Sequence, residues 1–179
     1  MRLYDAFVSP RQGTVSIVLE YCGGGSLQDV VDAGGCRDER VLARMAAHSL
    51  RGVAYLHAHR QLHRDIKPAN ILCSTSGDVF KIADFGIVRQ LDSTQEYAKT
   101  WVGTMVYMSP ERLAASASAG GGYSFAADIW SLGLSLLSVA LGRYPFRETV
   151  YWELLKVGTL AAHTYTHTPT RARPCAAVH

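Results

Sequence analysis

The sequence has little of several features that would assign a protein to a class at once. It contains only four cysteines, and none of them belongs to a CxxC pair. We therefore expect free thiols in a reducing compartment rather than a disulfide framework or a zinc site. The formal net charge is only +3, and the Lys and Arg residues are scattered along the chain. This balance favours neither a nucleic acid nor a membrane as a partner.

Long apolar runs are missing as well. The longest, around residues 129–141, is interrupted by serines and a glycine and is too short to span a membrane. The N-terminus lacks the charged region and apolar core of a signal peptide. From these absences we expect a soluble protein of the cytoplasm, with the nucleus as a second compartment.

The length and the apolar content of 48% fit one globular domain. Two segments between Leu3 and Cys22, rich in β-formers, flank the turn formers SPRQG and predict a β-hairpin. Ser26 can then cap a short helix. A longer amphipathic helix is predicted from the N-cap Asp38 to His57. Its apolar positions at helical spacing are Leu42, Ala46, Ser49 or Leu50, Val53 and Leu56.

Further along the chain, two short strands at residues 71–73 and 79–82 flank STSGD and predict a second hairpin. Residues 84–113 show neither the helical nor the strand periodicity of apolar residues, and they predict a long functional loop. The stretch AASASAGGGYS predicts a flexible insertion, and VYWELLKVG leaves a last amphipathic trace. Before that trace, a buried helix that is apolar on most sides is predicted from Ile129, Leu132, Leu136, Leu137, Ala140 and Leu141.

The stretch HRDIKPANIL, residues 63–72, contains an acid, a lysine and an amide at a spacing that suits phosphoryl transfer. This reaction needs a carboxylate that orients the attacking hydroxyl, and Mg²⁺ held by a second carboxylate and an amide. Asp65, Asp84 and Asn70 are the candidates for these roles. The second predicted hairpin returns the chain from Asn70 to Asp84 and would bring the oxygen donors together.

Four motifs follow one another in order: HRDIKPANIL, DFG at 84–86, GTMVYMSPER at 103–112 and DIWSLG at 128–133. Together they resemble the C-terminal half of a eukaryotic protein kinase. The resemblance implies an α+β, protein-kinase-like fold, mostly the helical C-terminal lobe with a remnant β-hairpin of the N-terminal lobe. Residues 1–158 would form a partial kinase domain, with 1–22 as N-lobe remnant and hinge and 23–158 as an incomplete C-lobe. Residues 159–179 would be a divergent, disordered tail.

The resemblance also assigns catalytic roles. Asp65 would be the catalytic base, and Lys67 would neutralise the transferring phosphoryl group. A lysine two places after the aspartate is typical of serine/threonine kinases. Asn70 and Asp84 would bind Mg²⁺, and ATP would be the phosphate donor.

Several other residues resemble structural residues of kinases. His63 and Phe85 would pack internally, and for His63 a satisfied core histidine is favoured over a titrating role. Asp128 resembles the aspartate that ties down the backbone of the catalytic loop, with a helix N-cap as the alternative. Glu111 would normally pair with an arginine from a later region that has no counterpart here. An unpaired Glu111 would be destabilising if it were buried.

The run VLEYCGGGSL resembles the hinge of a kinase. Adenine would meet backbone groups of Glu20 and Cys22, and Leu19 would guard the pocket behind them. Leu72 would pack under the adenine ring, although ordinary strand core is an equally good interpretation. Ser26, directly after the hinge, is a further candidate for the ATP site.

Among kinases, GTMVYMSPER and GGGSL look most like mitogen-activated protein kinase (MAP kinase) kinases. Thr94 and Thr100 fit the spacing of activation-loop phosphorylation sites in plant-type members, and a phosphate there could pair with Arg64. Both threonines could instead be ordinary polar loop residues. Thr104 would lie where the substrate binds. The partners would be a MAP kinase substrate and an upstream activating kinase.

Half of the expected ATP cradle has no counterpart in the sequence. Residues 1–62 contain no lysine and no GxGxxG loop. We therefore expect an ATP-dependent protein kinase that phosphorylates Ser and Thr, or Thr and Tyr if it has dual specificity. The chain of 179 residues is expected to be weakly active or inactive. The alternative is a non-catalytic, kinase-like binding module.

Overall fold

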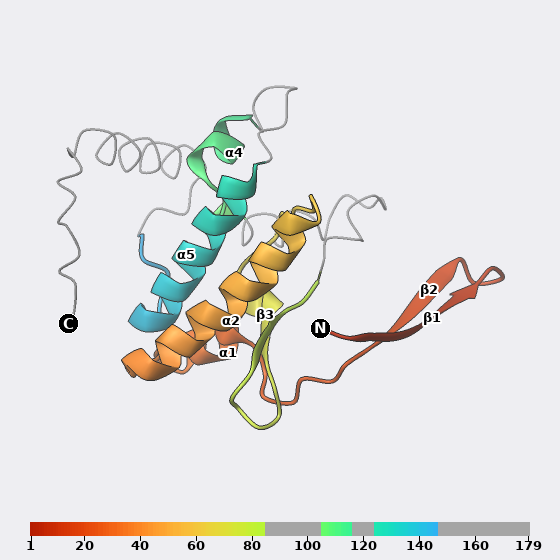
Figure 1. Cartoon of the computed structure of the whole chain (residues 1–179), viewed down its shortest axis with the longest axis horizontal. Helices are drawn as coiled ribbons and strands as arrows, with labels where there is room; N and C mark the ends of the chain where they lie inside the picture. Colours follow the sequence, from red (N-terminus) through yellow and green to blue (C-terminus); the bar gives the residue numbers. More distant parts are fainter. Residues whose placement is uncertain (85–104, 116–123, 147–179) are drawn as a thin grey trace, which may run out of the picture.

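The computed structural model describes residues 1–84, 105–115 and 124–146. Figure 1 shows two helices, α2 and α5, side by side, with the shorter elements packed around them and a long hairpin projecting from this body. Phe85, Thr94, Thr100, Thr104, the 150–158 segment and the tail lie outside the described residues. Predictions that concern these positions therefore remain predictions.

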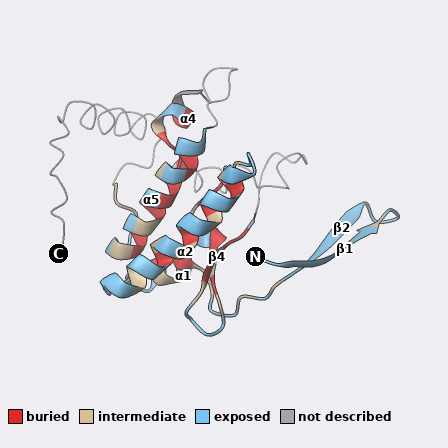
Figure 2. Cartoon of the chain, in the orientation of Figure 1, coloured by how far each residue is buried: buried red, intermediate tan, exposed pale blue. Residues whose placement is uncertain are grey.

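The first hairpin is confirmed. Strands β1 (Leu3–Ser9) and β2 (Thr14–Leu19) pair antiparallel. Gly13 lies in the connecting turn with φ +61°, a backbone conformation that a residue without Cβ adopts at little cost. The hairpin points away from the helices (Figure 1), and nearly all of its side chains are exposed (Figure 2). Its strand pairing is thus formed with little help from the core.

Both predicted helix starts are also confirmed. Ser26 caps α1 (Leu27–Asp32) in a reciprocal capping box with Asp29. Asp38 caps α2 (Glu39–Ala58), where its carboxylate accepts from the N–H of Arg40 at 2.8 Å. Of the two alternatives for the middle of α2, Ser49 faces the core, whereas Leu50 is 46% exposed.

The second hairpin is confirmed to within one residue, as β3 (Ile71–Cys73) and β4 (Phe80–Ile82), directly after a short 3₁₀ turn at Pro68–Asn70. The predicted loop over 84–113 is wrong at its end, because helix α4 (Pro110–Ala115) begins there. Proline is common in the first turn of a helix, where its missing N–H costs nothing. The sequence Ser109-Pro110-Glu111 therefore held a start signal for this helix.

Helix α5 (Phe125–Leu141) forms where a helix was expected, but one of its faces is exposed, although the sequence predicted a helix buried on most sides. Ile129, Leu137 and Leu141 are 44–46% exposed. The side chains that face the core instead include three serines, each of which donates to a carbonyl four residues back: Ser131, Ser135 and Ser138. Small side chains let α5 lie close to its neighbours.

The core lies between α1, α2, α5 and the β3–β4 hairpin, and Figure 2 shows the buried faces of α2 and α5 turned towards the inside of this body. Its fully buried members are Leu27, Val53, Ile71, Leu132 and Val139. Within the described ranges, no helix is both long and apolar enough to cross a membrane.

Candidate active site

The loop after α2 and the 3₁₀ turn that follows it hold the predicted catalytic residues close together. The Nζ of Lys67 lies 3.1 Å from Oδ2 of Asp65, a carboxylate that is largely buried. Asn70 donates from Nδ2 to the same Oδ2 at 3.1 Å and to the backbone oxygen of Asp65 at 2.8 Å. The structure therefore brings Asp65, Lys67 and Asn70 into one cluster.

Asp84 comes next to this cluster through the strand pairing. The N–H of Ala83 donates to the carbonyl of Asn70 at 2.8 Å, so Asp84 follows the residue that is bonded to Asn70. Asp84 itself is exposed, with φ +58°. This left-handed conformation is uncommon for residues other than glycine, although aspartate adopts it more readily than most.

His63 is a buried, neutral packing residue. Its Nδ1 accepts the N–H of Asp65 at 3.3 Å, so the proton sits on Nε2, which donates to the carbonyl of Ala83 at 3.0 Å. Burial lowers the pKa of His63, and this outweighs the opposing effects of the Ala83 hydrogen bond and of Asp128, Asp65 and Asp84. The interpretation of His63 as a satisfied core histidine fits this geometry.

Asp128 holds the backbone of the loop that precedes Asp65. Its carboxylate accepts the N–H of His63 at 2.9 Å and of Arg64 at 3.0 Å. Nε2 of His57, at the end of α2, lies 2.9 Å from the same carboxylate. The N-cap of α5 is Ser124, so the alternative role for Asp128 does not apply.

The segment that resembles a hinge passes directly beside β3. Ser26 forms an isolated bridge with Leu72, and the N–H of Cys73 donates to the carbonyl of Gly25 at 2.8 Å. Gly24 donates to the carbonyl of Cys73, and a Cβ on Gly24 would lie 2.3 Å from the oxygen of Ser74. The glycines thus permit a close backbone approach that places Leu72 next to Ser26.

The remaining hinge candidates lie at the base of the first hairpin. Leu19 ends β2 and is 46% exposed, and Cys22 is half-buried. The carboxylate of Glu20 is bonded to Nζ of Lys81 on β4. This hydrogen bond lowers the pKa of Glu20 and raises the pKa of Lys81. Lys81 was not among the predicted site residues.

The donor set of the cluster suits a hard cation. Mg²⁺ prefers oxygen ligands and commonly binds through one or two carboxylates together with substrate phosphates. Asp84 and Asn70 would supply one carboxylate and one amide oxygen, which fits this pattern. A protein-only metal cluster of three or more His, Cys, Asp or Glu residues is not found in the part of the chain that is described. A pocket of about 300 Å³ between α2 and β4 contains none of the predicted site residues.

Two residues on α4 complete the surroundings of the loop. Glu111 is exposed, so the unfavourable burial of an unpaired carboxylate does not arise. Arg112, which the sequence analysis did not single out, is 7% exposed and donates from Nη1 to the carbonyl of Arg64 at 2.7 Å. His57 was missed as well. Neither residue has a periodicity or spacing signal, because each partner is distant in sequence.

The comparison with known families agrees with this arrangement. Residues 1–173 match the protein kinase domain. The chain belongs to the protein kinase family. Its fold is therefore an α+β kinase fold, as the motifs implied.

Curated relatives narrow the similarity to MAP kinase kinases. A dual specificity mitogen-activated protein kinase kinase of Dictyostelium discoideum is 46% identical over 144 residues, which cover 80% of this chain and 21% of the relative. Mitogen-activated protein kinase kinase 1 of Arabidopsis thaliana is 46% identical over 144 residues, which cover 80% of this chain and 38% of the relative. A MAP kinase kinase of Schizosaccharomyces pombe is 42% identical over 150 residues, which cover 82% of this chain and 39% of the relative. The chain thus spans between about a fifth and two fifths of the length of these relatives.

Proposed function

We propose that this protein is an ATP- and Mg²⁺-dependent kinase that phosphorylates serine or threonine, and by dual specificity also tyrosine, of a MAP kinase. The observation that carries the proposal is the cluster in which Lys67 and Asn70 both contact the carboxylate of Asp65, at 3.1 Å each. A carboxylate, a cation and an amide at these distances are the groups that phosphoryl transfer requires.

Each side chain has a defined task in this reaction. The substrate hydroxyl oxygen attacks the γ-phosphorus of ATP, its proton passes to Asp65, and ADP leaves. Lys67 neutralises charge that develops on the transferred group. Asn70 and Asp84 would hold Mg²⁺, which supplies charge neutralisation for the phosphates. The hinge backbone at Glu20 and Cys22 would bind adenine, with Leu19 behind it and with Leu72 and Ser26 below.

The regulatory part of the proposal concerns Thr94 and Thr100. An upstream kinase would phosphorylate both, and the guanidinium of Arg64, next to Asp65, would pair with a phosphate in bidentate geometry. The side chain of Arg64 extends from an exposed residue, which makes it accessible to such a group. Thr104 would contact the substrate.

A test of transfer compares two proteins: residues 1–179, and the same chain behind the N-terminal lobe of a MAP kinase kinase relative. We expect the second to phosphorylate an inactive MAP kinase from radiolabelled ATP. The first should transfer phosphate near background, because residues 1–62 supply no lysine for the phosphates.

In the active protein, Asp65→Asn and Asp84→Asn should each lower kcat by about 10³-fold or more. Asp65→Asn should still bind ATP with Mg²⁺, whereas Asp84→Asn should bind it weakly. Asp32→Asn, at an exposed position on α1, serves as the matched control and should retain activity. Absence of transfer from the wild-type fusion, with ATP bound normally, would instead favour a kinase-like binding module.

A further inference from the structure

The guanidinium of Arg112 contacts the backbone of the loop that holds Asp65. Arg112 is 7% exposed, and its Nη1 donates to the backbone oxygen of Arg64 at 2.7 Å. Burying a guanidinium is costly unless it is paired or hydrogen-bonded. A short, charge-assisted hydrogen bond to a carbonyl offsets part of this cost.

The carbonyl that accepts this bond belongs to a strained residue. Arg64 has φ +70°, in the left-handed region, which is unfavourable for a residue with a Cβ. Such a conformation persists only where the surroundings fix it. Asp128 accepts the N–H of Arg64 at 3.0 Å on one side, and Arg112 holds its carbonyl on the other.

The next residue along the chain is Asp65. The peptide group that joins Arg64 to Asp65 is planar, so a donor that fixes its oxygen also fixes its nitrogen and the Cα of Asp65. The N–H of this peptide donates to Nδ1 of His63. Arg112 therefore acts on the backbone from which the carboxylate of Asp65 extends, at a distance of one peptide unit.

From this geometry we propose that Arg112 is a positioning residue for the Asp65 carboxylate. The guanidinium, carried by α4, locks the Arg64–Asp65 peptide, and the locked peptide aims the carboxylate at Lys67 and Asn70. The inference rests on the proposed function, since aiming the carboxylate matters for transfer only if Asp65 accepts the substrate proton. The competing role is anchorage of α4 alone.

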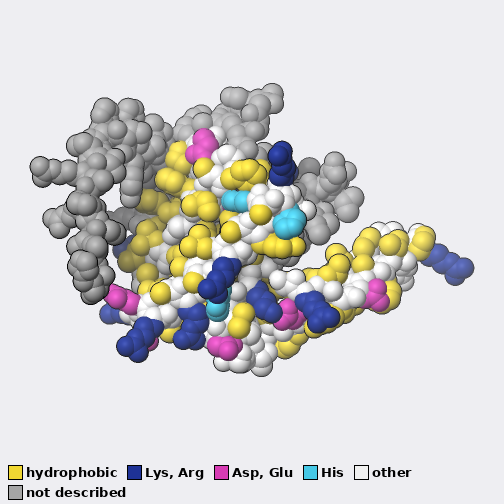
Figure 3. Space-filling model, in the orientation of Figure 1, with side chains coloured by type: hydrophobic (Ala, Val, Ile, Leu, Met, Phe, Trp, Pro, Cys, Tyr) yellow, Lys and Arg dark blue, Asp and Glu magenta, His cyan; other side chains and the backbone are white. Residues whose placement is uncertain are grey.

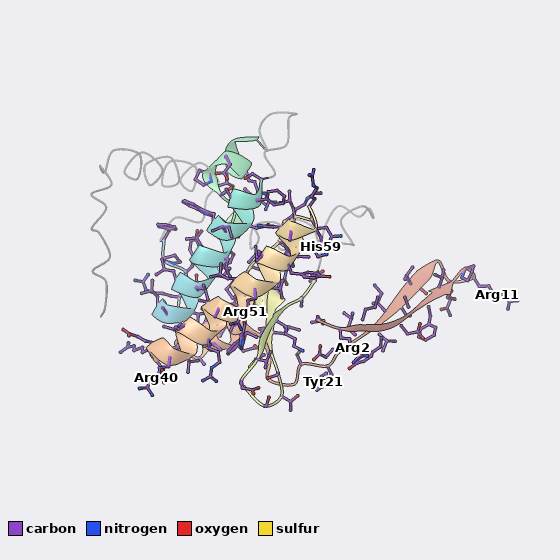
Figure 4. All side chains as sticks on the ribbon, viewed as in Figure 1. Arg2, Arg11, Tyr21, Arg40, Arg51 and His59 are labelled. Atoms are coloured by element: carbon purple, nitrogen blue, oxygen red, sulfur yellow. The ribbon has the colours of Figure 1, made fainter. Side chains whose placement is uncertain are left out.

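The two roles are separable by NMR spectroscopy of isotopically labelled chain 1–179, which requires no enzymatic activity. Arg112→Met should move the carbonyl signal of Arg64, and with it the carboxyl signal of Asp65 and the side-chain amide signals of Asn70. Amide exchange at Arg64 should accelerate by about tenfold or more. Arg51→Met is the control, because Arg51 lies on the exposed face of α2 (Figure 4) and should leave all these signals in place.

Movement of the Arg64 and α4 signals, with the Asp65 and Asn70 side-chain signals unchanged, would overturn the proposal in favour of simple anchorage. If Arg112→Met does not fold, Arg112→Lys is the variant that tests the proposal, because lysine keeps the positive charge and a hydrogen-bond donor. In Arg112→Lys the Arg64 carbonyl and Asp65 carboxyl signals should shift together. Both shifts should be smaller than those expected when the contact is lost completely. A shift of the carbonyl signal alone would again overturn the proposal.

Kinetics of the active fusion provide the second arm. Arg112→Met should lower kcat by about tenfold or more and leave KM for ATP within about twofold, because misplacing a reacting group affects the chemical step. Equal kcat in wild type and Arg112→Met would contradict positioning. If the wild-type fusion transfers no phosphate, the proposed function fails, whereas the NMR result still decides whether Arg112 places Asp65.

Discussion

Asp128 connects the end of α2, the catalytic loop and the first turn of α5 through one carboxylate. Both of its oxygens accept backbone N–H groups, and an amide at this position would turn an NH₂ group towards one of these donors. A buried donor that loses its acceptor costs about 1–3 kcal/mol.

We therefore predict that Asp128→Asn lowers the free energy of unfolding by about 2–3 kcal/mol. Urea unfolding of the two proteins measures the difference. Asp38→Asn is the matched control, because asparagine caps a helix as well as aspartate does. Similar losses in the two variants would show that the hydrogen bonds of Asp128 have no special weight.

His63 predicts a pH dependence of stability. Its pKa in the folded chain is lowered from 6.5 by burial, so the unfolded chain binds a proton that the folded chain resists. The stability is fully present above pH 6.5 and is lost as the pH falls from there towards the folded pKa. The slope is at most about 1.4 kcal/mol per pH unit for one group.

Urea unfolding at about pH 7.5 and about pH 5.5 tests this behaviour. His63→Gln should flatten the difference between the two pH values, even if it lowers stability at both. His59→Gln changes an exposed histidine at the end of α2 (Figure 4) and should leave the difference as in wild type. An unchanged difference in His63→Gln would refute the assignment.

At the scale of elements, α5 presents its serines to the core. Ser135 is fully buried, whereas Leu137, two positions along, is 44% exposed. Ser135→Leu inserts volume where the helix meets its neighbours and should destabilise the chain by about 1–3 kcal/mol. Leu137→Gln should change stability by less than about 0.5 kcal/mol. Thermal and urea unfolding measure the two effects, and a larger loss of stability in Leu137→Gln than in Ser135→Leu would contradict this orientation of α5.

The elements themselves were largely predictable. Short segments on either side of turn residues identified both hairpins, and the caps Ser26 and Asp38 identified the starts of α1 and α2. The orientation of α5 was not predictable from hydropathy, because each serine satisfies its hydroxyl within the helix and can then be buried. Helix α4 was missed because the absence of periodicity outweighed the proline at its start.

The cluster of Asp65, Lys67 and Asn70 was predictable to a similar degree. Asp65, Lys67 and Asn70 lie within one short segment, so their spacing already limits how far apart they can be. Contacts between residues far apart in the sequence could be predicted only where a family motif includes the residue, as for Asp128. Arg112 reads in the sequence as an ordinary surface cation, and only the fold shows that it is buried against Arg64.

At the scale of the whole molecule, the first hairpin has one apolar face that is exposed in the part of the chain that the structure describes. The strand register places the side chains of one face together as Leu3, Ala6, Val8, Val15, Ile17 and Leu19. All are exposed, and Figure 3 shows the hydrophobic side chains along the projecting hairpin. A two-stranded hairpin with open edges and an apolar face is prone to associate with other chains.

Purified chain 1–179 should accordingly form larger species as its concentration rises. Ile17→Lys places a charge on the apolar face and should reduce this association, as measured by light scattering. Ser16→Lys adds the same charge on the opposite face and serves as the control. Equal scattering from the two variants would point to net charge, rather than the apolar face, as the cause.

The bond between Glu20 and Lys81 joins the base of this hairpin to β4, and both side chains are partly exposed to solvent. Attraction between such groups is screened by dissolved ions, with a Debye length of about 3 Å at 1 M salt and about 30 Å at 0.01 M. The orientation of the hairpin should therefore depend on ionic strength, being tightly defined in dilute buffer and looser in concentrated salt. Since Glu20 also lies in the segment that would meet adenine, salt would act on the nucleotide site through the direction in which the hairpin points.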